Sequence, residues 1–343
     1  MNESRSTPAL WWTLAGVGTV LAVQALVNQR RTIDFTGKTI VITGGSRGLG
    51  LALTREFARQ GANVAICARD AAELDAARRD LQTAGYDVFT YVCDITDKVQ
   101  VGAFIEAVDK VLGPVDVLVN DAGIIVVSPL ENTTEADFRD AMEINFWGAY
   151  NMVNAVLPTM RERRAGRIVN IASFGGKIAV PHLIPYSVSK FALVGYSEGL
   201  RAELLQDNIY VTTVCPGLIR TGSPRNAIYK GQNEKEYTVF KIGDSLLGVT
   251  IAADACARQI VRATKIGKAE EIITFTAQLG TILQGLAPGL VADTMALVNR
   301  ALPAPGGIGE RRAWGKDSET PLSQSFLTTL TDQAAEENNE LVK

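Results

Sequence analysis

A tyrosine and a lysine four residues apart, Tyr186 and Lys190, have the spacing that most clearly allows chemistry. Residues at positions i and i+4 of a helix share one face, so the phenol and the ammonium can lie side by side. A neighbouring ammonium favours the phenolate, and we therefore expect it to lower a phenol pKa that is ordinarily about 10. Ser173, upstream in the sequence, would hydrogen-bond a developing negative charge. Together the three residues predict an acid–base site that acts on an oxygen atom.

The segment Thr43–Gly50 reads T-G-G-S-R-G-L-G and lies between a β-branched, strand-like run and a helical stretch. Glycine lacks a Cβ atom, so the backbone can turn sharply and approach a phosphate group, which the helix N-terminus attracts. The plain alternative is a tight turn between a strand and a helix that binds no ligand. Beside an acid–base pair, the loop predicts a dinucleotide that exchanges hydride with a carbonyl–alcohol pair.

The end of the second predicted strand indicates which dinucleotide binds. A site for NAD has a carboxylate there, about 20 residues after the glycines, to hold the ribose diol. Ala68 stands at that point, Arg69 follows it, and Arg47 lies within the glycine loop. Two guanidinium groups can hold a 2′-phosphate, whereas surface arginines paired with nearby acids are the alternative. We predict NADP(H) as the cofactor, with Asp70 as the cap of the next helix.

From residue 39 onward, short apolar runs alternate with amphipathic stretches, which is typical of a parallel sheet. We predict an α/β fold of the doubly wound Rossmann type, with seven parallel strands, helices on both faces and a single catalytic domain, residues 36–275. The predicted strands are Thr39–Thr43, Asn63–Ala68, Asp87–Val92, Val115–Asn120, Arg167–Ile171, Tyr210–Val214 and Glu271–Phe275. The predicted helices are Gly48–Gln60, Ala71–Ala84, Lys98–Leu112, Glu135–Arg163, Pro185–Gln206 and Ala252–Lys265.

Residues 1–31 differ from the rest, because residues 9–27 are almost wholly apolar. Some twenty helical residues match the roughly 30 Å thickness of the hydrocarbon core of a membrane. The pair Arg30-Arg31 follows the apolar stretch, and basic residues favour the cytoplasmic side. We predict a single-pass anchor in membrane lipid with the catalytic domain facing the cytoplasm. A cleaved signal peptide and a peripheral or core helix are the alternatives.

Three segments near or after the predicted sheet have distinct compositions. Leu218–Leu247 is polar and long for a connection, which indicates a lid or specificity loop. Residues 276–310 begin mostly uncharged and are broken at Pro288-Gly289, which favours a cap over the substrate mouth or an interfacial contact, whether with membrane or a second subunit. Residues 311–343 are polar, and we predict a solvated, disordered tail there.

The overall composition excludes several classes of function. A net charge of −3 argues against a nucleic-acid partner, which would call for a basic face. The single histidine, His182, and the absence of paired cysteines argue against a metal site. Four scattered cysteines in mostly apolar runs predict buried free thiols and a reducing compartment.

At these residues the chain resembles the single-domain type of the short-chain dehydrogenase/reductase family, over about Thr36–Phe275. Its glycine loop is similar to the family's T-G-x-x-x-G-x-G, and Asn120-Asp121-Ala122-Gly123 resembles N-N-A-G. Asp121 replaces the second asparagine of that motif, which leaves the usual hydrogen bonds of that position open. The resemblance implies cofactor contacts from Thr43, Gly44, Ser46, Arg47, Gly48, Leu49, Gly50, Arg69, Asp94, Asn120, Ala122, Gly123, Tyr186, Lys190, Pro216, Gly217 and Thr221.

The resemblance also implies a catalytic tetrad of Asn145, Ser173, Tyr186 and Lys190. Tyr186 would exchange a proton with the substrate oxygen, and Asn145 would hold a water that links Lys190 to solvent. The predicted activity is interconversion of a carbonyl and an alcohol on a hydrophobic substrate such as a lipid, steroid or retinoid. An inactive NADPH-binding scaffold or redox sensor and a sugar-nucleotide epimerase or dehydratase are the rivals. Family members commonly form dimers or tetramers, so a homodimer or homotetramer is expected.

Overall fold

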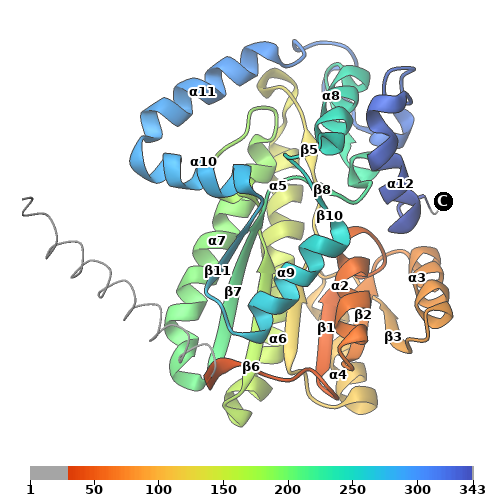
Figure 1. The fold of residues 1–343 in the computed structure, drawn as a ribbon, viewed down its shortest axis with the longest axis vertical. Coiled ribbons are helices and arrows are strands. Elements are labelled where there is room, and N and C mark those ends of the chain that lie inside the picture. Colours follow the sequence, from red (N-terminus) through yellow and green to blue (C-terminus); the bar gives the residue numbers. More distant parts are fainter. Residues whose placement is uncertain (1–29, 342–343) are drawn as a thin grey trace, which may run out of the picture.

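Alternating strands and helices build a seven-stranded parallel sheet in residues 30–341, the part of the chain that this computed structural model describes (Figure 1). The strand order is β11-β7-β6-β4-β1-β2-β3. The predicted Rossmann-type sheet is confirmed, and the predicted strand ends differ by at most two residues. The strands are β1 (Thr39–Thr43), β2 (Asn63–Ala68), β3 (Val88–Val92), β4 (Val117–Asn120), β6 (Gly166–Ile171), β7 (Ile209–Pro216) and β11 (Glu270–Ile273).

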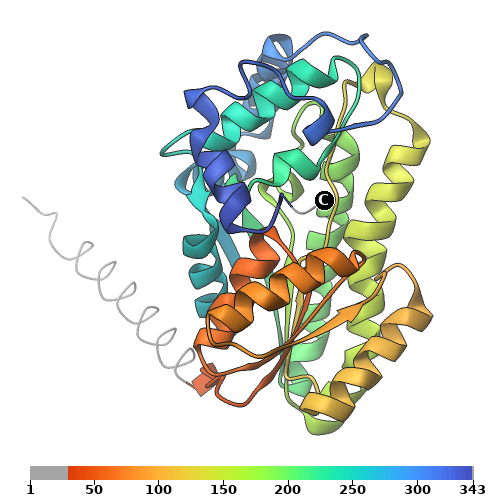
Figure 2. The same cartoon turned by 90° about the vertical axis from the view of Figure 1, so that its right-hand side faces the viewer.

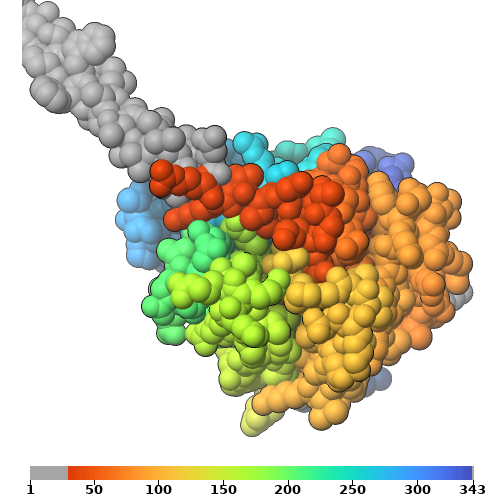
Figure 3. All heavy atoms as spheres, turned by 90° about the horizontal axis from the view of Figure 1, so that it is seen from below, coloured from red at the N-terminus to blue at the C-terminus, as the bar shows by residue number. Residues whose placement is uncertain are grey.

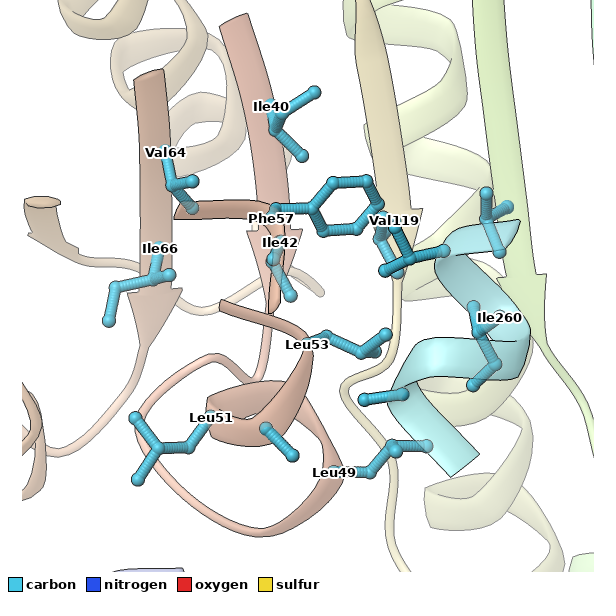
Figure 4. Packing of buried hydrophobic residues seen from close by; sticks show 14 of the residues in the cluster. Ile40, Ile42, Leu49, Leu51, Leu53, Phe57, Val64, Ile66, Val119 and Ile260 are labelled. Atoms are coloured by element: carbon cyan, nitrogen blue, oxygen red, sulfur yellow. The ribbon is translucent and has the colours of Figure 1, made fainter. Parts of the chain in front are cut away.

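Helices cover both faces of the sheet, because the strands bury apolar side chains on both sides. One face packs against helices α2 (Gly48–Arg59), α3 (Ala71–Thr83) and α9 (Ala253–Lys265). Figure 4 shows this side, where the Phe57 ring of α2 lies beside Ile42 and Val119. The other face packs against α4 (Lys98–Leu112), α6 (Gly148–Arg163) and α7 (Ile184–Leu204).

The carboxyl ends of the strands meet at one edge of the sheet, where the remaining elements gather (Figures 1 and 2). Figure 3 looks onto the opposite end, where the red, orange, yellow and green parts of the chain form most of the surface and the dark-blue C-terminal residues show only at the rim. The chain reverses direction across the sheet after β3, since β4 pairs with the other side of β1. Ligands of open α/β sheets bind at such a reversal.

The predicted lid Leu218–Leu247 is an ordered unit rather than a bare loop. It contains β8 (Ile219–Arg220), the 3₁₀ turn η5 (Ser223–Asn226), β9 (Ile228–Tyr229) and α8 (Asn233–Ser245). Strand β9 joins β5 (Val126–Val127) and β12 (Ala313–Trp314) in a small second sheet, and β8 pairs with β10 (Ile251–Ala252). The segment is therefore held by strand pairing at two places, through β9 and through β8.

The structure differs from the expectation of a solvated tail over residues 311–343. Here the chain forms η6 (Gly315–Asp317), η7 (Phe326–Thr328) and α12 (Thr329–Glu337), which pack against α8. Lys241 donates to the carbonyl oxygen of Ser323 at 2.7 Å and pairs with Asp332 at 2.6 Å. Polar side chains of the tail thus find partners inside the protein, which composition does not reveal.

Residues 275–301 form the helix pair α10 (Phe275–Leu286) and α11 (Pro288–Ala301), with the break at the predicted proline. Many of their large apolar side chains are exposed, including Phe275 at 74% and Leu286 at 78%. The predicted anchor lies outside the described residues, except for Arg30 and Arg31, and stays a prediction. Among residues 30–341, no helix is both long enough and apolar enough to cross a bilayer. All four cysteines are buried free thiols, as predicted.

Candidate active site

Helix α7 carries the predicted acid–base pair in its first two turns. Pro185 occupies the first turn, where its missing N–H costs nothing and its fixed φ suits the helix. Tyr186 follows, and Lys190 lies one turn later with its ammonium 5.6 Å from the centre of the phenol ring. The Lys190 side chain is almost fully buried and donates to the carbonyl oxygen of Ile171, at the end of β6, at 2.8 Å. This bond holds the start of α7 against the sheet edge.

Ser173 lies just after β6 and begins the short 3₁₀ turn η3 (Phe174–Gly176). Its Oγ accepts a hydrogen bond from the Gly175 backbone N–H at 3.0 Å. The Ser173 side chain lies near the Tyr186 phenol and lowers its pKa in part. The structure therefore brings together the two hydroxyl groups that the sequence predicts to act on one oxygen atom.

The expected lowering of the Tyr186 pKa is not present in this structure. Burial raises the pKa of Tyr186 to about 12, and the nearby Asp121 carboxyl adds to the rise. Burial lowers the pKa of Lys190 to about 8, although Asp121 opposes that change. Loss of solvent disfavours both charged forms, and this effect outweighs the attraction between phenolate and ammonium. The lysine, rather than the tyrosine, thus has the pKa nearer neutrality.

Asn145 lies in a π-helical turn, η2 (Glu143–Trp147), between α5 (Glu135–Met142) and α6. The sequence predicts one unbroken helix over residues 135–163, so this turn is an unpredicted feature. The buried Asn145 amide accepts from the Ile124 N–H at 2.8 Å and donates to Ser189 Oγ at 2.9 Å. A Cβ atom on Gly123 would lie 2.9 Å from Asn145 Oδ1 and 3.7 Å from Lys190 Nζ. The asparagine and the lysine therefore border the same glycine.

The glycine loop packs tightly against the end of β4. Gly44 has a φ of +71°, and a Cβ atom on it would lie 2.9 Å from the Cα of Ala122. A Cβ atom on Gly50 would lie 2.2 Å from the carbonyl oxygen of Gly44. Thr43 Oγ1 accepts from the N–H groups of Asp121 and Ala122, each at 3.1 Å. The loop geometry thus requires these glycines, and Thr43 joins the ends of β1 and β4.

Asp121, where the family motif has asparagine, lies beside Gly50, and burial raises the pKa of its carboxyl to about 7. Its neighbour Asn120 is buried and donates to Asn170 Oδ1 at 2.8 Å, while Asn120 Oδ1 has no partner. Asn170 in turn donates to Ser197 Oγ of α7 at 2.7 Å. A chain of buried amides thus crosses from β4 through β6 to α7.

The residues predicted to choose the dinucleotide lie at the ends of β1 and β2. Arg47 donates to Glu73 Oε1 at 3.0 Å, and Ser46 donates to the other oxygen of that carboxylate at 3.1 Å. Arg69 is exposed, directly after β2. Asp70 caps α3 by accepting from the N–H groups of Ala72 and Glu73, as predicted. Arg47 is therefore paired with a nearby acid, as the alternative to a 2′-phosphate contact expects.

The other predicted cofactor residues follow neighbouring strands. Asp94, after β3, accepts from the N–H and hydroxyl of Thr96 through one oxygen, at 2.9 and 2.8 Å. Pro216 ends β7, and the Gly217 N–H donates to the Ile273 carbonyl at 2.9 Å. Thr221 is buried, and its Oγ1 accepts from the Ser223 N–H at 3.2 Å. These residues all lie at the carboxyl edge that carries the glycine loop.

A nicotinamide dinucleotide fits this set of residues. Helix α2 begins at the glycine loop with no side-chain cap and no acidic residue in its first turn, so its N-terminus suits a phosphate group. Among residues 30–341, no group of three or more potential ligands (histidine, cysteine, aspartate or glutamate) is placed to hold a metal ion. Residues of the C-terminal segment, above all Glu340, also lie at this loop. Polar composition without periodicity gave no signal for them.

Comparison with known proteins agrees with this geometry. The short chain dehydrogenase family matches residues 38–230. A dehydrogenase/reductase SDR family protein 7-like protein from Anopheles gambiae is 37% identical over 242 residues, 66% of this chain and 76% of the relative. Ketoacyl reductase HetN from a Nostoc species is 34% identical over 184 residues, 54% of this chain and 64% of the relative. A solved protein described as a short-chain dehydrogenase, from Novosphingobium aromaticivorans, covers 78% of this chain and 98% of its own, at 24% identity and a TM-score of 0.64.

The fold and the site define a dinucleotide-dependent oxidoreductase with a Rossmann-type sheet. The family match covers more than half of the chain, which therefore belongs to the short-chain dehydrogenase/reductase family. The solved structure shows the shared fold. Enzymes of this family use nicotinamide cofactors, NAD(H) or NADP(H).

The tight packing of Gly44 yields a prediction about stability. Replacing Gly44 by alanine should lower the free energy of unfolding by roughly 1–3 kcal/mol, because φ is positive and the new Cβ meets backbone atoms. Gly102, exposed within α4 with no atom near its Cβ position, is the matched control. Gly102→Ala should raise the free energy of unfolding by up to about 1 kcal/mol. Urea denaturation measures both, and equal effects of the two changes would contradict this account of the loop.

Proposed function

We propose that this enzyme is an NADP(H)-dependent oxidoreductase that interconverts a carbonyl and an alcohol on a hydrophobic substrate. The observation that carries the proposal is the meeting of Ser173, Tyr186 and Lys190 beside the glycine loop, at the carboxyl edge of the sheet. A bound nicotinamide dinucleotide would supply the hydride for reduction or accept it for oxidation. The residues of the chain then have to orient the substrate and move one proton.

Ser173 and Tyr186 share the task at the substrate oxygen. Their side chains lie close to each other, so a carbonyl oxygen placed between them would meet two hydroxyl donors. As negative charge develops on that oxygen, Ser173 stabilises it and Tyr186 Oη donates its proton. In the reverse direction Tyr186 accepts the proton of the alcohol. A pKa raised to about 12 keeps Tyr186 protonated, and therefore ready for reduction, at neutral pH.

Lys190 and Asn145 would restore the proton that Tyr186 gives away. The Lys190 ammonium lies on the same helix face as the phenol, and burial lowers its pKa to about 8, so it can release a proton near neutrality. Asn145 borders the same glycine as Lys190. We propose that Asn145 holds the water that would link the Lys190 ammonium to solvent. Proton transfer of this kind contributes about 10²–10⁴ to a rate.

The preference for NADP(H) rests on Arg47 and Arg69. Ala68, at the end of β2, leaves no carboxylate there to hold a ribose diol, and Arg69 beside it is exposed. The Arg47 side chain is about a third exposed, at 34%, so a phosphate from solvent can reach it. Arg47 would exchange Glu73 for the 2′-phosphate, which forms stronger charge-assisted bonds.

The hydrophobic substrate is inferred from the surroundings of Ser173. The turn after it carries Phe174, whose ring would lie 2.8 Å from a Cβ atom on Gly280 of α10. Ile178 Cδ1 would lie 3.4 Å from the same Cβ position. Helix α10 therefore packs directly on the turn η3 that follows Ser173. The exposed apolar side chains of α10 form a surface next to that turn. An apolar substrate would remove part of that surface from water, which favours binding.

We propose further that residues 9–27 anchor the chain in a membrane, with the catalytic domain on the cytoplasmic side. Support comes from the apolar sequence followed by Arg30-Arg31. The chain expressed with membranes should stay in the membrane pellet after a sodium carbonate wash. Protease added to sealed vesicles should cut the catalytic domain only when the cytoplasmic face of the membrane points outward. Release by carbonate, or protection of the domain, would contradict the anchor or its orientation. Self-association into a homodimer or homotetramer stays a prediction.

Removal of one hydroxyl tests the assigned acid. Tyr186→Phe should lower kcat for reduction of a long-chain ketone by at least about 10²-fold while NADPH affinity stays within a factor of about three. Tyr196→Phe, on the same helix and within an aromatic cluster, is the control and should keep kcat. NADPH absorbance gives the rates, and fluorescence titration gives the affinity. Full activity of Tyr186→Phe would rule out the proposed mechanism.

The cofactor preference has its own test. Arg47→Ala should lower the ratio of NADPH to NADH affinity by about tenfold or more, because only NADPH carries the 2′-phosphate. Arg59→Ala is matched in charge and lies at the other end of α2, where its guanidinium pairs with Glu56 away from the glycine loop. That control should leave the ratio unchanged. A parent protein that binds NADH more tightly than NADPH would overturn the assignment.

A further inference from the structure

The C-terminal residues 334–341 lie against the glycine loop, above helix α2 in Figure 2. The Gly48 N–H, in the first turn of α2, donates to the carbonyl oxygen of Asn338 at 2.8 Å. The Asn339 side chain donates to the carbonyl oxygens of Ser46 and Glu73 at 2.8 and 3.1 Å. The segment thus uses the backbone groups of the loop and of α3 that border the proposed cofactor site.

Glu340 brings a buried carboxylate to the same place. It is 4% exposed, accepts from the Asn226 amide at 2.5 Å, and lies 3.7 Å from Arg47 Nε. A Cβ atom on Gly48 would lie 2.8 Å from Glu340 Oε1 and 3.9 Å from the Cβ of Thr221. A helix N-terminus and a guanidinium both attract anions. Glu340 therefore places its negative charge where these groups favour a phosphate.

We propose that residues 334–341 are an autoinhibitory segment that competes with the phosphates of the cofactor for the glycine loop. In this role Glu340 is the anion that takes the phosphate position, and the backbone of Asn338 occupies the Gly48 N–H. The inference rests on the proposed function, because it assigns a regulatory state to the same dinucleotide site. The apparent affinity for the cofactor would then depend on the fraction of molecules in which the segment has left the loop.

The charges around Glu340 show why the segment can leave. Burial raises the pKa of Glu340 to about 7, Arg47 lowers it in part, and Glu73 raises it. Burial raises the pKa of the buried carboxyls of Asp121 and Asp244 to about 7, and Glu340 adds to each rise. Neighbouring carboxyls disfavour one another's ionised form. Repulsion between Glu340 and these carboxyls therefore destabilises the docked state of the segment.

The contact between this short segment and the rest of the protein is also mostly polar. Its buried apolar side chains are the small ones of Ala334 and Ala335. Ala335 packs on Gly222, whose Cβ position lies 2.4 Å from the Cα of Ala335. Little apolar area is buried, and water can replace the hydrogen bonds, so local opening costs less than unfolding of the sheet.

Two substitutions in the full-length chain test the inference. Glu340→Ala removes the competing carboxylate, and Ala335→Arg puts a large charged side chain where Gly222 leaves no room. Each should lower the Kd for NADPH, measured by fluorescence titration, by about fivefold or more. Glu336→Ala is the control, because it removes the same charge from an exposed position on α12. That variant should keep the Kd of the parent.

Hydrogen exchange gives a readout that does not depend on affinity. In the parent chain, saturating NADPH should speed amide exchange in residues 334–341, since the segment has to leave the loop. Slower or unchanged exchange with bound NADPH would overturn the inference, because the segment would then close over the cofactor or lie apart from it. An equal Kd in the parent and all three variants would also overturn it, while leaving the proposed function intact. No saturable binding of NADPH or NADH to the parent or to either tail variant would overturn the proposed function, and the inference with it.

Discussion

The parallel register of β1, β4 and β6 is the constraint on which the site depends. Strands that run in the same direction end at the same edge, so Thr43, Asn120 and Ile171 come together although they are far apart in sequence. The glycine loop follows β1 and supplies the N-terminus of α2. The carbonyl oxygen of Ile171 accepts from Lys190, which fixes the first turns of α7 over that edge. Every assigned role in catalysis follows from this meeting of strand ends and helix starts.

Sequence alone predicted the sheet well, because each strand is a short apolar run and each helix has an amphipathic period. It also predicted that Ser173, Tyr186 and Lys190 come together, since spacing along α7 and the end of β6 are local features. The π-helical turn at Asn145 was not predicted, because residues 135–163 have the pattern of one helix and a single π-helical turn has no motif of its own. The pKa of Tyr186 was predicted in the wrong direction, because burial is a property of the tertiary structure.

The C-terminal segment shows most clearly what sequence cannot give. Its polar composition is that of a solvated tail, yet its side chains and carbonyl groups bond to residues up to about 290 positions away, such as Ser46. Such pairing has no period and no motif. The segment brings Glu340 to a loop whose sequence predicts a phosphate, so the same electrostatic preference explains both the cofactor site and its competitor. In the proposed autoinhibition, the cofactor and the segment would compete for the N–H group of Gly48 and for Arg47.

The central claim is that hydride passes between a nicotinamide cofactor and a carbonyl carbon held by Ser173 and Tyr186. Its most direct measurement uses NADPH carrying deuterium on one or the other face of the nicotinamide ring, with a long-chain ketone and mass spectrometry of the product. One of the two labelled cofactors should give an alcohol with one deuterium on the former carbonyl carbon. An alcohol that carries no deuterium with either cofactor would contradict the central claim.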